Sequence, residues 1–201
     1  MFIPHEFENK NDELNKILIQ NNPLALLIYN NECLEVTNIP ISFFGDKLVG
    51  HLSIRNEVCK MAKTGDISHL IFNSHSSYIS PSWYRNPSMN VPTWNYCTIK
   101  LTAKINKITD KQNIKTILEH QIRDFERSQW TMNDFPASLL DDMISEINAF
   151  EFKIKSIESK FKISQNRSKE DQISVIKNLQ KSKDDTLFIH NIMKQYYEIN
   201  E

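Results

Sequence analysis

The stretch that decides the fold class reads Cys97-Thr98-Ile99-Lys100-Leu101-Thr102-Ala103-Lys104-Ile105. Apolar and polar residues alternate along its whole length. Because successive side chains of a β-strand point to opposite faces of a sheet, this alternation predicts a strand with one buried face and one solvated face. We therefore expect a sheet that packs against a core on one side and meets water on the other.

Further strands are predicted on both sides of this stretch. Residues 24–29 form a continuous apolar run, and residues 34–39 return after a turn at Asn30-Asn31, which predicts a hairpin. In the segment 150–155, Phe150, Phe152 and Ile154 alternate with charged residues, so these three side chains are expected to face the core. The other predicted strands are residues 47–53, after a turn at Gly45-Asp46, and residues 67–72.

Helices are predicted between and after these strands. Asn11 or Asp12 is expected to cap a short helix that ends before Asn21, and Ser168 with Asp171 resembles a capping box. The other predicted helices are residues 55–64, closed by Gly65, a helix capped by Asp110 that runs towards Arg127, one opened by Pro136 that includes Ile144, and residues 185–197.

Short strands joined by tight turns, with helices gathered at the ends, predict a small β-barrel with added helices, an α+β fold. Repeats, low-complexity tracts and interdomain linkers are not evident in the 201 residues. We expect one barrel domain over residues 1–180 and a C-terminal helical extension over residues 181–201.

The composition narrows the class of partner and compartment. The chain has 24 Lys and Arg against 25 Asp and Glu, so it has no overall positive charge for binding nucleic acid, and DNA binding is unsupported. Cys33, Cys59 and Cys97 are widely spaced and predict reduced thiols rather than a disulfide framework. With no apolar stretch long enough to span a membrane and no signal-peptide pattern over residues 1–10, a cytoplasmic protein without membrane contact is expected.

Two aromatic segments lie on either side of a short polar loop. They read Ser80-Pro81-Ser82-Trp83-Tyr84 and Val91-Pro92-Thr93-Trp94-Asn95-Tyr96. Aromatic rings beside small hydroxyl and amide side chains suit a flat ligand with polar edges, so the pattern suggests the wall of a cofactor site. The alternative is that these rings only close the end of a sheet.

The same segments carry a family resemblance. Together with Met1-Phe2-Ile3-Pro4-His5-Glu6-Phe7 and Phe161-Lys162-Ile163-Ser164-Gln165-Asn166-Arg167, they resemble the PaiB-type family of FMN-binding negative transcriptional regulators. The likeness runs in the same order from the first residue to about Gln180. It implies a split-barrel flavin-binding fold like that of pyridoxamine-phosphate oxidases, a homodimer, and FMN bound at the subunit interface.

An FMN site needs cations and donors for the phosphate, polar groups for the ring edge and an apolar or aromatic surface for the ring face. Relatives place an arginine where this chain has Ile54, and a Thr-His pair at Thr37-Asn38, so an affinity below the family norm is expected. The residues expected to line the site are Thr37, Asn38, Ser53, Arg55, Asn56, Ser80, Trp83, Trp94, Asn95, Tyr96, Lys162, Gln165, Asn166 and Arg167.

The sequence leaves several functions open. The leading interpretation is a dimeric FMN protein with a role in flavin-linked redox chemistry, as in an FMN-dependent oxidoreductase, or in sensing, with negative regulation of transcription implied by the family. A haem-binding or haem-degrading split barrel and a cofactor-free dimeric interaction module are the alternatives. The histidines form no metal motif, and His51 is interpreted as a packed or hydrogen-bonded strand residue. No catalytic residue is identified.

Overall fold

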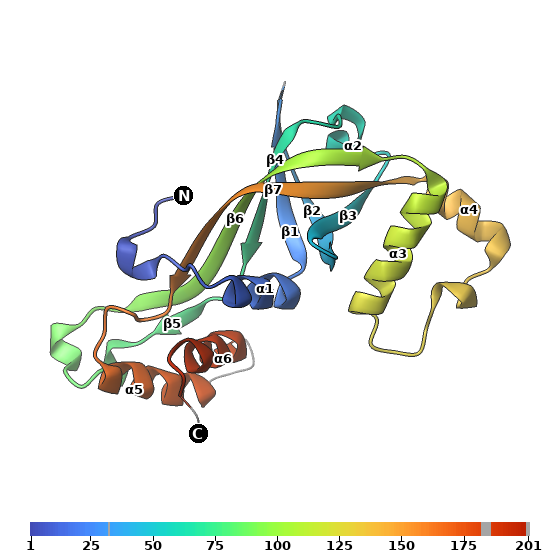
Figure 1. The fold of residues 1–201 in the computed structure, drawn as a ribbon. Coiled ribbons are helices and arrows are strands. Elements are labelled where there is room, and N and C mark those ends of the chain that lie inside the picture. Colours follow the sequence, from blue (N-terminus) through green and yellow to red (C-terminus); the bar gives the residue numbers. More distant parts are fainter. Residues whose placement is uncertain (32, 182–185, 200–201) are drawn as a thin grey trace. The chain divides into compact units, whose positions relative to one another are not determined.

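The computed structural model describes residues 1–31, 33–181 and 186–199 (Figure 1). The chain folds into two compact units, each built from separate segments. Unit 1 comprises Met1–Asn22, Phe72–Lys100 and Glu158–Glu201, and unit 2 comprises Pro23–Ile71 and Leu101–Ile157. Two long strands, β6 (Thr93–Ile108) and β7 (Ile147–Lys162), contribute residues to both units.

The strands form a sheet in the order β4-β1-β2-β3-β7-β6-β5, and β4 also pairs with β6. This last pairing joins the two ends of the run from β4 to β6 and closes it into a barrel. The predicted β-barrel with added helices is therefore confirmed. The remaining strands are β1 (Leu24–Asn30), β2 (Leu34–Phe44), β3 (Lys47–Ser53), β4 (Ile67–Asn73) and β5 (Ser77–Ile79).

The predicted hairpin and alternation are both present. β1 pairs antiparallel with β2, from Leu24 opposite Pro40 to Asn30 opposite Leu34. A close approach of β3 to β2 requires glycine at position 50, because a Cβ there would lie 2.7 Å from the carbonyl oxygen of Pro40. On β6 the apolar members of the quoted stretch are the buried ones: Cys97, Ile99, Leu101, Ala103 and Ile105.

The helices follow most of the predicted caps. α1 (Asp12–Asn21) is capped by the side chain of Asn11, and α3 (Lys111–Phe125) by that of Asp110. In unit 2, α3 follows β6 and α4 (Ala137–Ser145) precedes β7, and both pack on a core that includes Val49 and Ala149 (Figure 1). In unit 1, α5 (Lys169–Gln180) and α6 (Leu187–Tyr196) lie side by side.

Some sequence predictions were wrong in detail. The helix expected over residues 55–64 is only α2 (Glu57–Met61), and Gly65 does not close it: its N–H donates to the carbonyl of Ile105. Ile154 is 42% exposed, because it lies in the exposed stretch 153–157 of β7; burial of alternate side chains resumes at Ser159 and Phe161. Of the predicted capping box, the Ser168 side chain accepts from the N–H of Asp171 as expected. The carboxylate of Asp171 accepts from the N–H of Arg85.

The segment 182–185, which contains the expected start of the last helix at Asp185, and residues 200–201 lie outside the described residues. Cys59 and Cys97 are buried free thiols, whereas Sγ of the exposed Cys33 lies 3.6 Å from Oε1 of Glu35. Burial raises the pKa of the Cys97 thiol above its usual range. In the described part of the chain, no helix is both long and apolar enough to cross a membrane.

Candidate functional site

The end of β7 and the start of α5 position the central residues of unit 1. β7 ends at Lys162, and the chain then turns through Ser164, whose φ of 72° lies in the left-handed region. A left-handed conformation is uncommon for a residue with a Cβ and tends to occur where the fold holds the backbone in place. The side chain of Ser168 then caps α5 by accepting from the N–H of Asp171. This short turn brings Lys162 and Arg167 to one place.

Lys162 is held by neutral partners. Its Nζ donates to Oγ1 of Thr93 at 2.5 Å and to the carbonyl oxygen of Trp94 at 2.6 Å. Its ammonium also lies 5.8 Å from the ring centroid of Phe7. Burial lowers the pKa of Lys162, and the positive charges of Lys160 and Arg167 lower it further.

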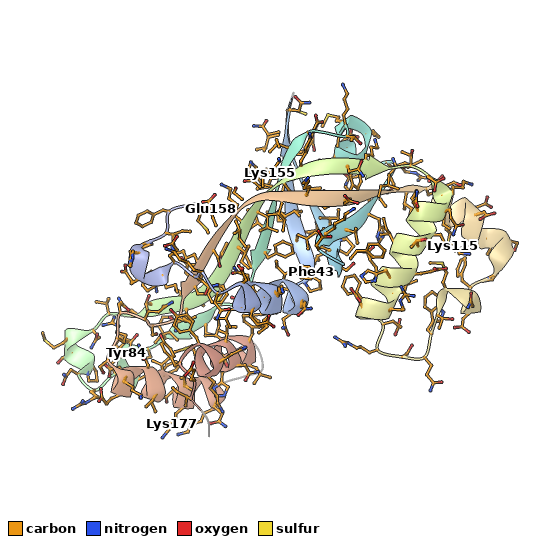
Figure 2. The ribbon with its side chains drawn as sticks, viewed as in Figure 1. Phe43, Tyr84, Lys115, Lys155, Glu158 and Lys177 are labelled. Carbon is orange, nitrogen blue, oxygen red and sulfur yellow. The ribbon has the colours of Figure 1, made fainter. Side chains whose placement is uncertain are left out.

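Arg167 is held by neutral groups as well. Its Nη1 donates to Oδ1 of Asn90 at 2.5 Å, and its guanidinium lies over the ring of Tyr84 at 4.6 Å. Tyr84 lies beside the start of α5 (Figure 2). Among the described residues, neither Lys162 nor Arg167 forms an ion pair with a carboxylate. Two cations without an anionic partner favour the binding of an anion between them.

A small cavity lies at these two cations. Its volume is about 130 Å³, and it is lined by Phe7, Tyr84, Thr93, Asn95, Lys162, Ser164, Asn166 and Arg167. The hydroxyl of Tyr84 is buried and has no hydrogen-bond partner in the described structure. An unpartnered buried hydroxyl costs free energy. The cavity offers two positive charges to one ligand, and Tyr84 forms part of its wall.

The structure brings together some of the site residues that the sequence predicted in unit 1. Lys162, Asn95, Asn166 and Arg167 all line the cavity, and the buried amide of Asn95 donates to Oγ of Ser164 at 2.9 Å. The side chain of Gln165 contacts the backbone instead. Its Oε1 accepts from the N–H of Ile163, and its Nε2 donates to the carbonyl of Phe161. It shapes the turn and is not among the residues lining the cavity.

The predicted aromatic wall is only partly present in this cavity. Of its four rings, Tyr84 alone is among the lining residues. Trp94 is 53% exposed and meets Tyr78 edge-on at 5.6 Å, while Tyr96 lies 5.3 Å from Nζ of Lys160. The other two predicted site residues of the first aromatic segment, Ser80 and Trp83, contact the protein backbone or a neighbouring helix. Ser80 caps the turn Pro81–Trp83, and the carbonyl of Trp83 accepts from Ser174.

The other predicted site residues lie in unit 2. Asn56 donates to Oγ1 of Thr37 at 3.0 Å and caps α2 by accepting from Val58. The guanidinium of Arg55 forms an ion pair with Glu146 at 3.1 Å, and Oγ of Ser53 accepts from the Arg55 backbone. Asn38 is exposed on β2. In this unit the one predicted cation is already paired.

Four lining residues were missed as site residues by the sequence analysis. Phe7, Tyr84, Thr93 and Ser164 all lie inside the motifs quoted above, and all but Phe7 are next to residues that were chosen. Tyr84 could have been found as the polar end of the first aromatic segment. The role of Ser164 depends on its left-handed backbone, which no sequence pattern indicates.

Comparison with known proteins identifies the family. Residues 1–156 match the family described as "Putative FMN-binding domain". The chain belongs to this family. It is also 26% identical over 190 residues to "Protease synthase and sporulation protein PAI 2" of Bacillus subtilis, covering 90% of this chain and 89% of the relative. The PaiB-type resemblance is thereby confirmed, and FMN is the cofactor of the family.

Two further comparisons concern fungi and solved structures. An uncharacterized protein of Aspergillus fumigatus is 26% identical over 134 residues, covering 56% of this chain and 51% of that protein. The FAD and heme binding protein of Mycobacterium smegmatis matches with a TM-score of 0.64 at 15% identity over 83% of this chain and 78% of that one. The flavocytochrome Anf3 of Azotobacter vinelandii matches with a TM-score of 0.61 at 18% identity, over 84% and 76% respectively. These structural matches support the split-barrel fold alone.

The residues of the unit 1 cavity fit part of an FMN molecule. A cavity of about 130 Å³ is smaller than one of ~150 Å³ that holds a single benzene ring, so it cannot enclose a three-ring flavin. It does suit a phosphate, because both cations can bond to phosphate oxygens. FMN carries such a group, and riboflavin does not.

Proposed function

We propose that this FMN-family protein binds the FMN phosphate in the unit 1 cavity, between Lys162 and Arg167. The observation that carries the proposal is the pair of cations without a carboxylate partner among the described residues, in a cavity that Tyr84 helps to line. Arg167 is suited to bond two phosphate oxygens at once, while Lys162 acts as a single positive charge.

The surrounding residues hold these groups in position. Asn90 and the ring of Tyr84 orient the guanidinium of Arg167, and Thr93 with the Trp94 carbonyl orients the ammonium of Lys162. Asn95 and Asn166 supply further amide groups at the cavity wall. The other predicted residues, Trp94 and Tyr96 among them, are proposed to meet the parts of FMN that the cavity cannot enclose.

Flavin-linked redox chemistry or sensing is the function this arrangement supports best. The bound flavin would supply the electron transfer, and the protein would bind it, orient it and limit its access to water. No side chain is assigned as an acid or a base. Negative regulation of transcription stays a prediction, tested by a salt-dependent gel shift of promoter DNA.

We also propose that the chain acts as a two-fold dimer in the cytoplasm. Leu34 and Val36 lie on one face of β2, where it pairs with β1, and are 64% and 49% exposed. An apolar face on the outside of a barrel strand favours contact with a second copy. The free thiols of Cys59 and Cys97 are compatible with a reducing compartment.

An absorption spectrum tests the proposed cofactor. The purified protein would be mixed with FMN, and separately with hemin, and then passed through a desalting column. We expect flavin absorption to co-elute with the protein and hemin to be removed. A Soret band retained in place of flavin would support the haem alternative, and loss of both would support a cofactor-free module. Light scattering on the same sample tests the dimer, which a monomer at micromolar concentration would contradict.

A further inference from the structure

A second, larger cavity lies within unit 2. It has a volume of about 230 Å³ and is enclosed by α3, α4 and the segment between them. Its walls include Ile122, Trp130, Met132, Phe135 and Leu140. His51 of β3 is the only titratable residue among those that line it. The cavity therefore combines an aromatic and apolar wall with one imidazole.

The hydrogen bonds of Gln121 fix the proton of His51. The Gln121 side chain is buried, and its Nε2 donates to the carbonyl of Pro40 at 3.0 Å and towards that of Val49 at 3.5 Å. Its Oε1 must therefore be the atom that meets Nδ1 of His51, at 2.7 Å. Because Oε1 can only accept, neutral His51 carries its proton on Nδ1, and Nε2 is left as an acceptor.

This acceptor is available to a ligand. Among the described residues, Nδ1 has the Gln121 partner and Nε2 of His51 has none. His51 is half-buried, and an acceptor at a cavity wall without a protein partner favours a ligand that brings a donor. The lining residues include no lysine, arginine or carboxylate, so a charged ligand would find no counter-charge there.

We propose that this cavity binds a small, neutral aromatic molecule with a single N–H or O–H donor, of the indole or phenol class. Its volume of about 230 Å³ exceeds that of a cavity of ~150 Å³ that binds benzene, so a fused two-ring molecule fits. Trp130 offers an aromatic partner, and the sulfur of Met132 a favourable contact with an aromatic ring. The donor of the ligand bonds Nε2 of His51.

The proposal is separate from the FMN site. Every residue that carries it belongs to unit 2, and the Lys162 and Arg167 cavity belongs to unit 1. The unit 2 cavity also lacks a cation for the FMN phosphate. Failure of either proposal therefore leaves the other standing. Adding FMN to the protein should leave indole binding unchanged, and competition between the two ligands would contradict separate sites.

Isothermal titration calorimetry with indole and benzofuran tests the proposal. The two molecules share a two-ring shape, but benzofuran has no donor. We expect indole to bind the full chain about three- to tenfold more tightly than benzofuran, which is the effect of one hydrogen bond. Equal affinities in the wild type would overturn the donor role, and no binding of either at millimolar concentration would overturn the site.

Variants locate the binding. Leu140 lines the cavity, so Leu140→Trp should fill it and abolish binding of both molecules. Leu139 is 51% exposed and is not among the lining residues, so Leu139→Trp is the matched control and should bind as the wild type does. His51→Phe should remove the preference for indole and keep benzofuran affinity. Unchanged indole binding by Leu140→Trp would contradict the site even if His51→Phe does not fold.

Discussion

The candidate phosphate-binding arginines of the two units differ in their side-chain partners. In unit 2, the Arg55 side chain is 83% exposed and paired with Glu146 at 3.1 Å. In unit 1, Arg167 lies over the ring of Tyr84, bonds the neutral amide of Asn90 and has no carboxylate partner among the described residues. A positive charge that is already neutralised contributes little to holding an anion. Both units contain a candidate arginine, but only the one in unit 1 lacks a carboxylate partner in the described part of the chain, and this difference favours unit 1 as the phosphate site.

The difference has a simple physical origin. Glu146 is 91 positions from Arg55 in sequence, and the fold of unit 2 brings the two side chains together. In unit 1, Glu158 pairs with Lys100 and the amino terminus, Asp171 accepts from the Arg85 backbone, and Glu170 lies 4.0 Å from the Arg85 guanidinium. These contacts leave Lys162 and Arg167 with hydroxyl, carbonyl and amide partners.

The largest expected effect is on the cations of unit 1. Replacement of Arg167 by Ala should weaken FMN binding by roughly 1.5 to 3 kcal/mol, about ten- to a hundredfold, because a charge-assisted contact is lost. Lys162→Ala should act in the same direction. Flavin fluorescence titration measures both affinities, and circular dichroism verifies that each variant is folded.

Arg85→Ala is the matched control for these variants. Arg85 belongs to the same unit, but its exposed side chain lies 4.0 Å from Glu170 and is not among the residues that line the cavity. FMN affinity should change by less than about twofold in this variant. If Arg167→Ala and Arg85→Ala bind FMN equally well, the cavity does not hold the phosphate.

A smaller effect is expected from pH. The pKa of Lys162 lies below the usual lysine value because of burial, Lys160 and Arg167, so its ammonium loses the proton at lower pH than an exposed lysine. Above about pH 6 the phosphate is a dianion, which favours the charged ammonium. FMN affinity should therefore fall, by up to about tenfold, as pH rises from neutrality towards the pKa that Lys162 has in the protein without FMN.

Lys162→Arg separates this effect from other titrations. Arginine stays protonated throughout the range, so the decline on the alkaline side should be absent or shifted to higher pH. A decline of the same size and midpoint in Lys162→Arg would assign it to another group.

The smallest effect is expected from Arg55 in unit 2. Because this guanidinium is exposed and paired with Glu146, Arg55→Ala should change FMN affinity by less than about twofold. Glu146→Gln releases Arg55 from its partner and should be equally neutral. Tighter FMN binding in Glu146→Gln would show that unit 2 competes for the phosphate, and the contrast between the units would then have to be abandoned.

Much of the fold could be predicted from local patterns. The alternation on β6, the β1–β2 hairpin and the caps at Asn11, Asp110 and Ser168 follow from periodicity and capping chemistry, which depend on neighbours in sequence. α2 ends at Met61, and Gly65, expected to close it, bonds instead to Ile105 on β6, a contact that sequence spacing does not reveal. The exposure of Ile154 depends on what packs beside β7.

The candidate site was predictable only in part. Lys162, Asn166 and Arg167 were found because they lie in one motif, and Tyr84 was next to chosen residues. The sequence could not reveal that Arg55 is paired or that the hydroxyl of Tyr84 has no partner. Both facts depend on contacts between distant segments.

The comparison of FMN with riboflavin in the wild-type protein tests the central claim most directly. The two molecules differ in the phosphate, so fluorescence titrations of both ligands measure its contribution. We expect FMN to bind at least about tenfold more tightly than riboflavin, as two cations without carboxylate partners require. Equal affinities for the two flavins would contradict the account, because they would leave the cavity at Lys162 and Arg167 without a role in binding the phosphate.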